Sequence, residues 1–162
     1  RTKNSGSGPK KAVSAMPAIT EKGTTYYLED ISVGMAAEYT REVTGDLIQS
    51  FADASGDDNP LHLDEDYAKT TMFKGRIAHG MLSGSFLSTI FGTIFPGPGG
   101  IYLGQNLKFV APVRIGDVVT ARAEVDEVLA DKGRVHFTCT CTVGGRNVIV
   151  GDAWIMPPRR GK

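Results

Sequence analysis

Residues 81–95 read MLSGSFLSTIFGTIF and contain no charged side chain. A helix that is apolar on all sides belongs inside a domain rather than on its surface. The stretch is also shorter than the roughly 20 residues that a bilayer requires. Pro96 and Gly97 follow it, and these residue types are typical of a helix end. We therefore expect a central, buried helix over residues 81–95.

Strands are expected after this helix, over residues 101–110, 117–129, 134–143 and 146–156. The pairs Lys132-Gly133 and Gly144-Gly145 separate the last three and are typical of tight hairpin turns. Within 134–143, apolar and polar residues alternate, which indicates an antiparallel sheet with one buried face. Only the 81–95 helix is apolar enough to cover that face. The expected fold is an α+β domain, a curved antiparallel sheet around one central helix.

The part of the chain before this helix gives weaker signals. Residues 38–44 have modest strand character. Asp46 can cap a helix that runs from Leu47 to about Ala54. Residues 55–60 are turn formers and predict a polar loop, and a short helix is expected around 64–69.

The domain boundaries follow from composition. Residues 1–24 are rich in Gly, Ser, Lys and Pro and lack a hydrophobic period, which predicts a tail without fixed structure. The basic residues in this tail leave a mitochondrial transit segment as an alternative. We expect one domain over 25–158 and a short C-terminal tail over 159–162.

Composition restricts the class of function. The 162 residues carry a formal net charge of +0, which gives no reason to expect nucleic acid or a membrane surface as a partner. Cys139 and Cys141 lie two apart on one strand, roughly 6–7 Å between Cα atoms, a separation that strains a disulfide. No further Cys or close His pair offers a zinc site. We expect a cytoplasmic protein with no metal and no cofactor.

Candidate chemistry lies in residues 55–62, which read SGDDNPLH. Asp57 and His62 can converge if the loop between them folds back, and Asn59-Pro60 favours such a turn. A carboxylate and an imidazole can exchange protons with water or carbon near neutral pH. Taken alone, an Asp and a His near a turn are more often ordinary surface groups.

A family resemblance changes that interpretation. The pattern SGDxNPLH at 55–62, followed by five residues and Ala68, resembles the signature of the (R)-specific enoyl-CoA hydratases, the MaoC-like dehydratases. RIAHGML at 76–82, IYLGQNLKF at 101–109 and PVxxGD at 112–117 resemble further blocks of the same family. The resemblance covers nearly all of the expected domain.

The resemblance implies a hot-dog fold and reversible hydration of a trans-2-enoyl-CoA to the (3R)-3-hydroxyacyl-CoA. It implies that Asp57 and His62 are the catalytic pair. The Gly80 amide would bind the thioester carbonyl, because helix N-termini present free N–H groups and a positive dipole. Asn59 would hold the loop or touch the thioester.

The acyl pocket is expected at Ser88 and Phe91, with Ile155 closing its floor. Because the Phe91 ring fills volume, we expect a preference for acyl chains of roughly four to six carbons. His79 is expected to cap or pack at the helix start rather than to touch substrate.

Two other functions remain open at this point. An acyl-CoA thioesterase on the same fold often has a carboxylate on the central helix, and 81–95 contains none. A non-catalytic acyl-binding protein would have lost the acid–base pair. The substrate is expected to be an acyl-CoA, with an acyl-carrier-protein thioester as the alternative, and the assembly a homodimer formed at sheet edges.

Overall fold

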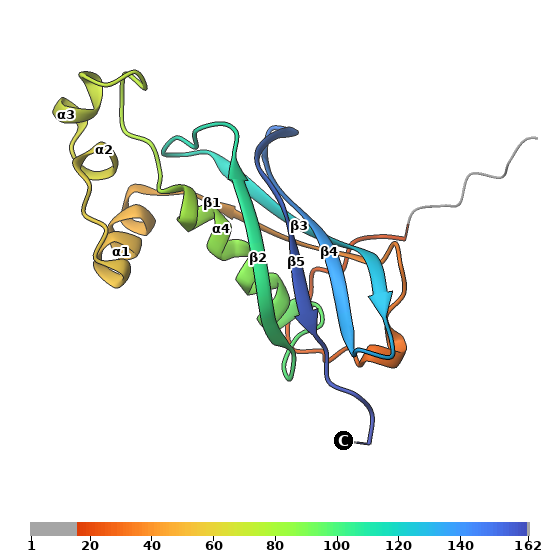
Figure 1. Ribbon diagram of the computed structural model, residues 1–162. Helices are drawn as coiled ribbons and strands as arrows, with labels where there is room; N and C mark the ends of the chain where they lie inside the picture. The colour runs from red at the N-terminus through yellow and green to blue at the C-terminus, as the bar shows by residue number, and fades with distance from the viewer. Residues whose placement is uncertain (1–15, 162) are drawn as a thin grey trace, which may run out of the picture.

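The computed structural model describes residues 16–161, which form a five-stranded antiparallel sheet wrapped around one helix (Figure 1). The strand order is β1-β3-β4-β5-β2. The bounds of the strands are Ala36–Glu42 (β1), Ile101–Phe109 (β2), Val118–Leu129 (β3), Arg134–Val143 (β4) and Arg146–Met156 (β5). The α+β hot-dog architecture expected from the sequence is confirmed.

The central helix α4 spans Gly80–Thr89 and continues as a wider π-helical turn, η2, over Ile90–Ile94. It crosses one face of the sheet, as Figure 1 shows in green. The inward residues of β4 are Val135, Phe137, Cys139 and Cys141, and all four are fully buried. Phe137 packs edge-on against Phe91 and Phe95 of the helical segment. The prediction that one face of β4 is buried against the helix is therefore confirmed.

Three short helices form a lobe beyond the N-terminal end of α4: α1 (Gly45–Ser55), α2 (Pro60–Leu63) and α3 (Glu65–Lys69) (Figure 1). The cap of α1 is Thr44, whose side chain accepts the Leu47 N–H at 3.1 Å. The expectation that Asp46 caps this helix is therefore wrong. The N-cap of α3 is Asp64, which accepts the Tyr67 N–H at 3.1 Å.

The domain extends beyond the ends expected from the sequence. Ile19 pairs with β1, donating to Ala36 at 2.8 Å and accepting from Glu38 at 2.9 Å. Arg159 and Arg160 also bond to the domain, at Ala130 and Asp30 respectively. Residues 16–24 and 159–161 are therefore not free tails, and the rest of the expected N-terminal tail lies outside the described residues.

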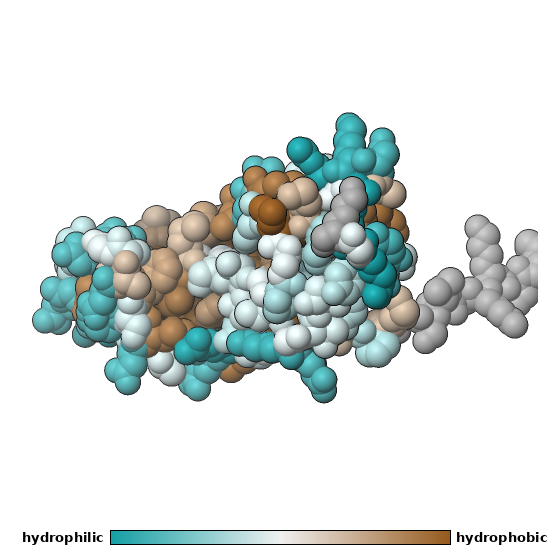
Figure 2. All heavy atoms as spheres, turned by 90° about the horizontal axis from the view of Figure 1, so that it is seen from below, coloured by the Kyte–Doolittle hydropathy of each residue, from teal (hydrophilic) through white to brown (hydrophobic). Residues whose placement is uncertain are grey.

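Strand β2 is an edge of the sheet, and its burial pattern is mostly exposed. Figure 2 shows apolar surface, in brown, next to the largely hydrophilic end at the left. Large apolar side chains are exposed on or next to this strand: Ile101, Tyr102, Leu103, Phe109 and Val110. Among the described residues, no helix is long and apolar enough to span a membrane.

Candidate active site

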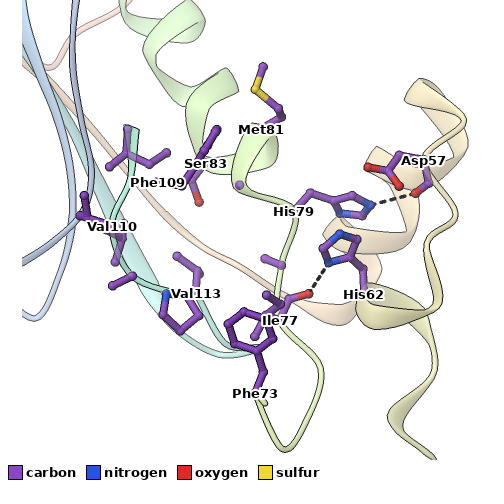
Figure 3. Close-up of a pocket in the computed structure, with 16 residues that line it drawn as sticks. Asp57, His62, Phe73, Ile77, His79, Met81, Ser83, Phe109, Val110 and Val113 are labelled. Atoms are coloured by element: carbon purple, nitrogen blue, oxygen red, sulfur yellow. Dashed lines mark hydrogen bonds between the residues drawn. The ribbon is translucent and has the colours of Figure 1, made fainter. Parts of the chain in front are cut away.

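A cavity of about 410 Å³ opens where the helical lobe meets the start of α4 (Figure 3). Its lining is mostly apolar, with Phe73 and Ile77 from the segment that leads into α4 and Phe109 and Val113 from the end of β2 and the turn after it. The polar side chains that line it are Asp57, His62, His79 and Ser83. An apolar cavity with a few convergent polar groups is the usual form of a small-molecule site.

The loop between α1 and α2 places the Asp57 carboxylate. Gly56 ends α1 in the left-handed conformation at φ 80°, where a glycine carries no steric penalty. Asp57 then accepts the backbone N–H of Asn59 at 3.3 Å. Asn59 in turn caps α2 by accepting the Leu61 N–H at 3.1 Å. Asn59 thus holds this loop, and its contact with the thioester stays a prediction.

The polar loop predicted over 55–60 is followed by the short helix α2, which contains His62. The His62 side chain is buried, with only 9% of its surface exposed. Its Nδ1 lies 2.8 Å from the carbonyl oxygen of Ile77. Because a carbonyl can only accept, Nδ1 carries the proton, and Nε2 has the free lone pair of the neutral ring. Burial lowers the pKa of His62 below its ordinary value of 6.5, and the neighbouring His79 contributes in the same direction.

His79 precedes Gly80 and is 2% exposed. Its Nε2 donates to the main-chain carbonyl of Asp57 at 2.9 Å, and its ring stacks on that of His62 with centroids 3.9 Å apart. It makes no side-chain cap on α4. Packing at the helix start is thus its structural role, and this packing links the loop of Asp57 to the helix of Gly80.

A carboxylate oxygen of Asp57 and a ring nitrogen of each histidine lie within 4.8 Å of one another. One water can hydrogen-bond across such a gap, since two bonds of about 2.8 Å span it. Two imidazoles and a carboxylate can also bind zinc. That no metal is needed stays a prediction, checked by activity in the presence of a chelator.

Gly80 is the first residue of α4, so its backbone N–H has no acceptor within the helix. It is exposed and lines the cavity beside His79. A Cβ atom at this position would lie 2.5 Å from the Phe109 ring. A larger residue here would therefore displace the Phe109 ring, which lies against the helix start and lines the cavity beside the Gly80 N–H.

The residues expected to form the acyl pocket lie elsewhere in the single chain. Ser88 is exposed, Phe91 packs edge-on against Tyr102 at 5.2 Å between centroids, and Ile155 is buried in the core. None of the three lines the cavity around Asp57 and His62. Their role in holding an acyl chain stays a prediction.

Sequence reasoning missed how the loop before α4 is held. Arg114 donates to the carbonyls of Phe73 at 2.6 Å and Gly75 at 3.3 Å, and Arg76 donates through Nε to the carbonyl of His62 at 2.7 Å. Both arginines could be taken from sequence for solvated side chains or phosphate ligands. Their long-range backbone acceptors leave no local pattern in the sequence.

Comparison with known proteins places this arrangement in a family. The sequence profile of the MaoC-like domain matches residues 30–145. The chain belongs to the MaoC-like dehydratase family. An (R)-specific enoyl-CoA hydratase of Rhodospirillum rubrum is 52% identical over 136 residues, covering 84% of this chain and 94% of that protein. A 3-hydroxybutyryl-CoA dehydratase of Methylorubrum extorquens is 41% identical, covering 83% and 85%.

Solved structures of MaoC-like proteins agree with the fold. The unliganded R-hydratase PhaJ1 of Pseudomonas aeruginosa has a TM-score of 0.81 at 45% identity, covering 86% of this chain and 90% of that chain. An (R)-hydratase of A. caviae involved in PHA biosynthesis has a TM-score of 0.78 at 40% identity, covering 80% and 99%. The family inferred from the motifs at 55–62 and 76–82 is confirmed.

Proposed function

We propose that this MaoC-like protein is a lyase that adds water to a trans-2-enoyl-CoA to give the (3R)-3-hydroxyacyl-CoA, and catalyses the reverse dehydration. The observation that carries the proposal is the convergence of Asp57, His62 and the free Gly80 N–H on one mostly apolar cavity. Relatives 40–52% identical, named (R)-specific enoyl-CoA hydratase or 3-hydroxybutyryl-CoA dehydratase, support the same reaction.

In the proposed hydration, a water lies between the Asp57 carboxylate and His62. The lone pair on His62 Nε2 accepts a proton from the water as its oxygen bonds to C3 of the substrate. Asp57 accepts the second O–H of the water and stabilises the imidazolium that forms. The lowered pKa of His62 keeps the ring neutral before the reaction, as a base requires.

Attack at C3 moves the electron pair of the double bond toward the thioester, and negative charge develops on its carbonyl oxygen. The Gly80 N–H at the positive end of α4 stabilises that charge. The imidazolium of His62 then returns a proton to C2, which restores the thioester and the neutral ring. One water is added, with its OH at C3 and one H at C2.

The test of this function is crotonyl-CoA hydration followed by loss of enoyl absorbance, with free thiol assayed in parallel. We expect absorbance loss without thiol release. Release of coenzyme A in step with turnover would instead indicate a thioesterase, although residues 80–94 contain no Asp, Glu or Gln. Crotonyl-acyl-carrier-protein in the same assay tests the alternative carrier.

We also propose a preference for short acyl chains. Phe91 of η2 packs edge-on against Tyr102 and Phe137, and cores do not expand to admit methylenes without a cost of about 1–3 kcal/mol. The kcat/KM for crotonyl-CoA should exceed that for a ten-carbon enoyl-CoA by about 5–150-fold. In Phe91→Leu this ratio should move toward the longer chain, whereas a wild type that favours ten carbons removes the proposal.

The exposed β2 edge supports a homodimer, because an unpaired apolar edge strand tends to pair with another. Sedimentation at micromolar concentration should give twice the 17.3 kDa of the chain. A species of 17.3 kDa alone would count against the dimer. The two free, buried thiols support a cytoplasmic setting.

A further inference from the structure

Ser83 has a buried hydroxyl that finds no hydrogen-bond partner among the described residues. The residue is 1% exposed. Serines and threonines inside helices usually bond to a carbonyl on the preceding turn. Ser85 does so to Leu82 and Thr93 does so to Thr89, each at 2.6 Å. Ser83 lies on the same helical segment without such a bond, so its hydroxyl is available to something outside the helix.

The Ser83 hydroxyl lies in the wall of the active-site cavity, and Figure 3 shows its side chain pointing from α4 into the cavity. The other polar side chains that line the cavity belong to the cluster of Asp57, His62 and His79. Side chains on a helix lean toward its N-terminus, so the Ser83 side chain points toward the first turn of α4. That turn carries the free N–H of Gly80.

We propose that Ser83 is a substrate-binding residue whose hydroxyl donates a second hydrogen bond to the thioester carbonyl oxygen, beside the Gly80 N–H. The inference rests on the proposed function and adds to it a second donor for the enolate oxygen. Ser83 keeps its proton throughout, so it takes no part in proton transfer. Its contribution is electrostatic, and it increases as charge develops on the oxygen.

This role has a consequence for stability. A buried hydroxyl without a partner destabilises the free protein, since it has lost its bonds to water. Removal of the hydroxyl should therefore stabilise the protein while it weakens catalysis. A serine with only a packing role would show the opposite coupling, because loss of packing lowers stability.

The first experiment compares Ser83→Ala with Ser85→Ala, the same substitution at an exposed position two residues further along α4. For Ser83→Ala we expect kcat/KM for crotonyl-CoA to fall about 10–100-fold, mostly in kcat. We also expect Tm to rise by about 2–4 °C. Ser85→Ala should leave kcat/KM unchanged. A Ser83→Ala variant with wild-type kcat/KM, or with lowered Tm and lowered activity together, overturns the inference.

A second experiment identifies the bonded atom. Butyryl-CoA, a saturated thioester, and S-butyl-CoA, a thioether without the carbonyl oxygen, are titrated against wild type and Ser83→Ala. The substitution should weaken butyryl-CoA binding about 5-fold and leave the thioether unchanged. His79 Nδ1, like the Ser83 hydroxyl, is buried with no hydrogen-bond partner among the described residues. Equal weakening of both ligands would show that Ser83 shapes the cavity or holds a water against His79 Nδ1, and would overturn the assignment. No change for either ligand would overturn it as well.

The kinetics of wild type and Ser83→Ala distinguish failure of the proposed function from failure of the Ser83 role. If wild type does not hydrate crotonyl-CoA, the proposed function is wrong whatever Ser83 does. If wild type hydrates crotonyl-CoA and Ser83→Ala does so at the same rate, only the role of Ser83 is wrong.

Discussion

His62 lies in the cavity between α2 and α4, whereas His136 lies on the face of the sheet that points away from α4. At His62 the ring meets one backbone carbonyl and a second imidazole. At His136, Nδ1 lies 2.6 Å from Asp126 and Nε2 lies 2.7 Å from Asp152. His62 thus lies in a mostly apolar cavity with the Asp57 carboxylate within 4.8 Å of a ring nitrogen, whereas His136 is hydrogen-bonded to two carboxylates.

The pKa values of the two rings move in opposite directions from 6.5. Burial lowers the pKa of His62. Burial also opposes charge on His136, but the hydrogen bonds to Asp152 and Asp126 outweigh it and raise the pKa. A ring with a lowered pKa is suited to accept a proton from water, whereas a raised pKa favours charge on the ring that joins the strands carrying its two carboxylates. The surroundings of each ring, and not the residue type, therefore distinguish His62, the candidate catalyst, from His136, which links neighbouring strands.

The largest expected effect is on kcat, which should fall on replacement of His62 but not on replacement of His136. Asp57→Asn and His62→Gln should each lower kcat for crotonyl-CoA by about 10²–10⁴-fold with a smaller change in KM, because each loses a group that acts on the water. His136→Gln should stay within about twofold of wild type. Steady-state kinetics on the three variants, with circular dichroism to confirm folding, makes the comparison.

His62 is buried, so its replacement needs a structural control. Gln can still donate to the Ile77 carbonyl, which limits the disturbance of α2. Near-wild-type turnover in either the Asp57 or the His62 variant would remove that residue from the catalytic pair.

The second expected effect concerns stability. His136→Gln should lower the free energy of unfolding by about 1–2 kcal/mol, since two charge-assisted bonds at a partly exposed site are lost and two carboxylates are left facing each other. Thr140→Val, on the same strand and face, is the matched control. Urea unfolding of both variants measures the difference.

The stabilisation from His136 should also depend on pH. Because its folded pKa is raised, the contribution is fully present below the unfolded value of 6.5 and is lost as pH rises through the folded pKa. The pKa of Asp152 is lowered by the His136 bond, so its contribution is present above 3.8 and is lost as pH falls through the folded pKa. The gap between wild type and His136→Gln should be larger at pH 6 than at pH 9. An equal gap at both would mean that the ring is not charged in the folded protein.

The smallest expected effect is a shift in the pH profile of catalysis. Since the pKa of His62 is lowered, kcat/KM should stay high at pH 6.5 and fall only at more acid pH. His79→Gln retains a donor for the Asp57 carbonyl but removes a neighbour whose charge lowers the pKa of His62. The acid limb of this variant should therefore move toward higher pH. An acid limb above pH 6.5 in wild type would contradict the neutral-base assignment.

Much of the fold follows from local patterns in the sequence. The uncharged stretch 81–95 and the alternation over 134–143 predict the helix and the sheet, because each pattern has one stable way to bury its apolar face. The sequence predicts the N-cap of α1 at Asp46, two residues after the true cap at Thr44, since both residue types cap helices. No pattern in the sequence predicts that residues 16–24 join the domain, because the bonds of Ile19 to β1 and of Gly23 to Thr93 involve only the backbone.

Some residues of the candidate site can be predicted from the sequence, and others cannot. Asp57, His62 and Gly80 could be named because they lie in recognisable motifs, and the structure brings them to one cavity. Arg114 and Ser83 could not, since what they contact or lack depends on segments far apart in the sequence. The hydrogen bonds of His136 to Asp126 and Asp152 also have no signal in the sequence. Asp126 reaches the ring only because a register shift interrupts the pairing of β3 with β4.

The most direct test of hydration at this site is the configuration of the product. Wild-type protein is incubated with crotonyl-CoA, the thioester is hydrolysed chemically after the reaction, and the 3-hydroxybutyrate is resolved on a chiral column. We expect the (3R) enantiomer from wild type and almost none from His62→Gln over the same time. The (3S) enantiomer, or equal formation of product by wild type and variant, would contradict (R)-specific hydration by Asp57 and His62.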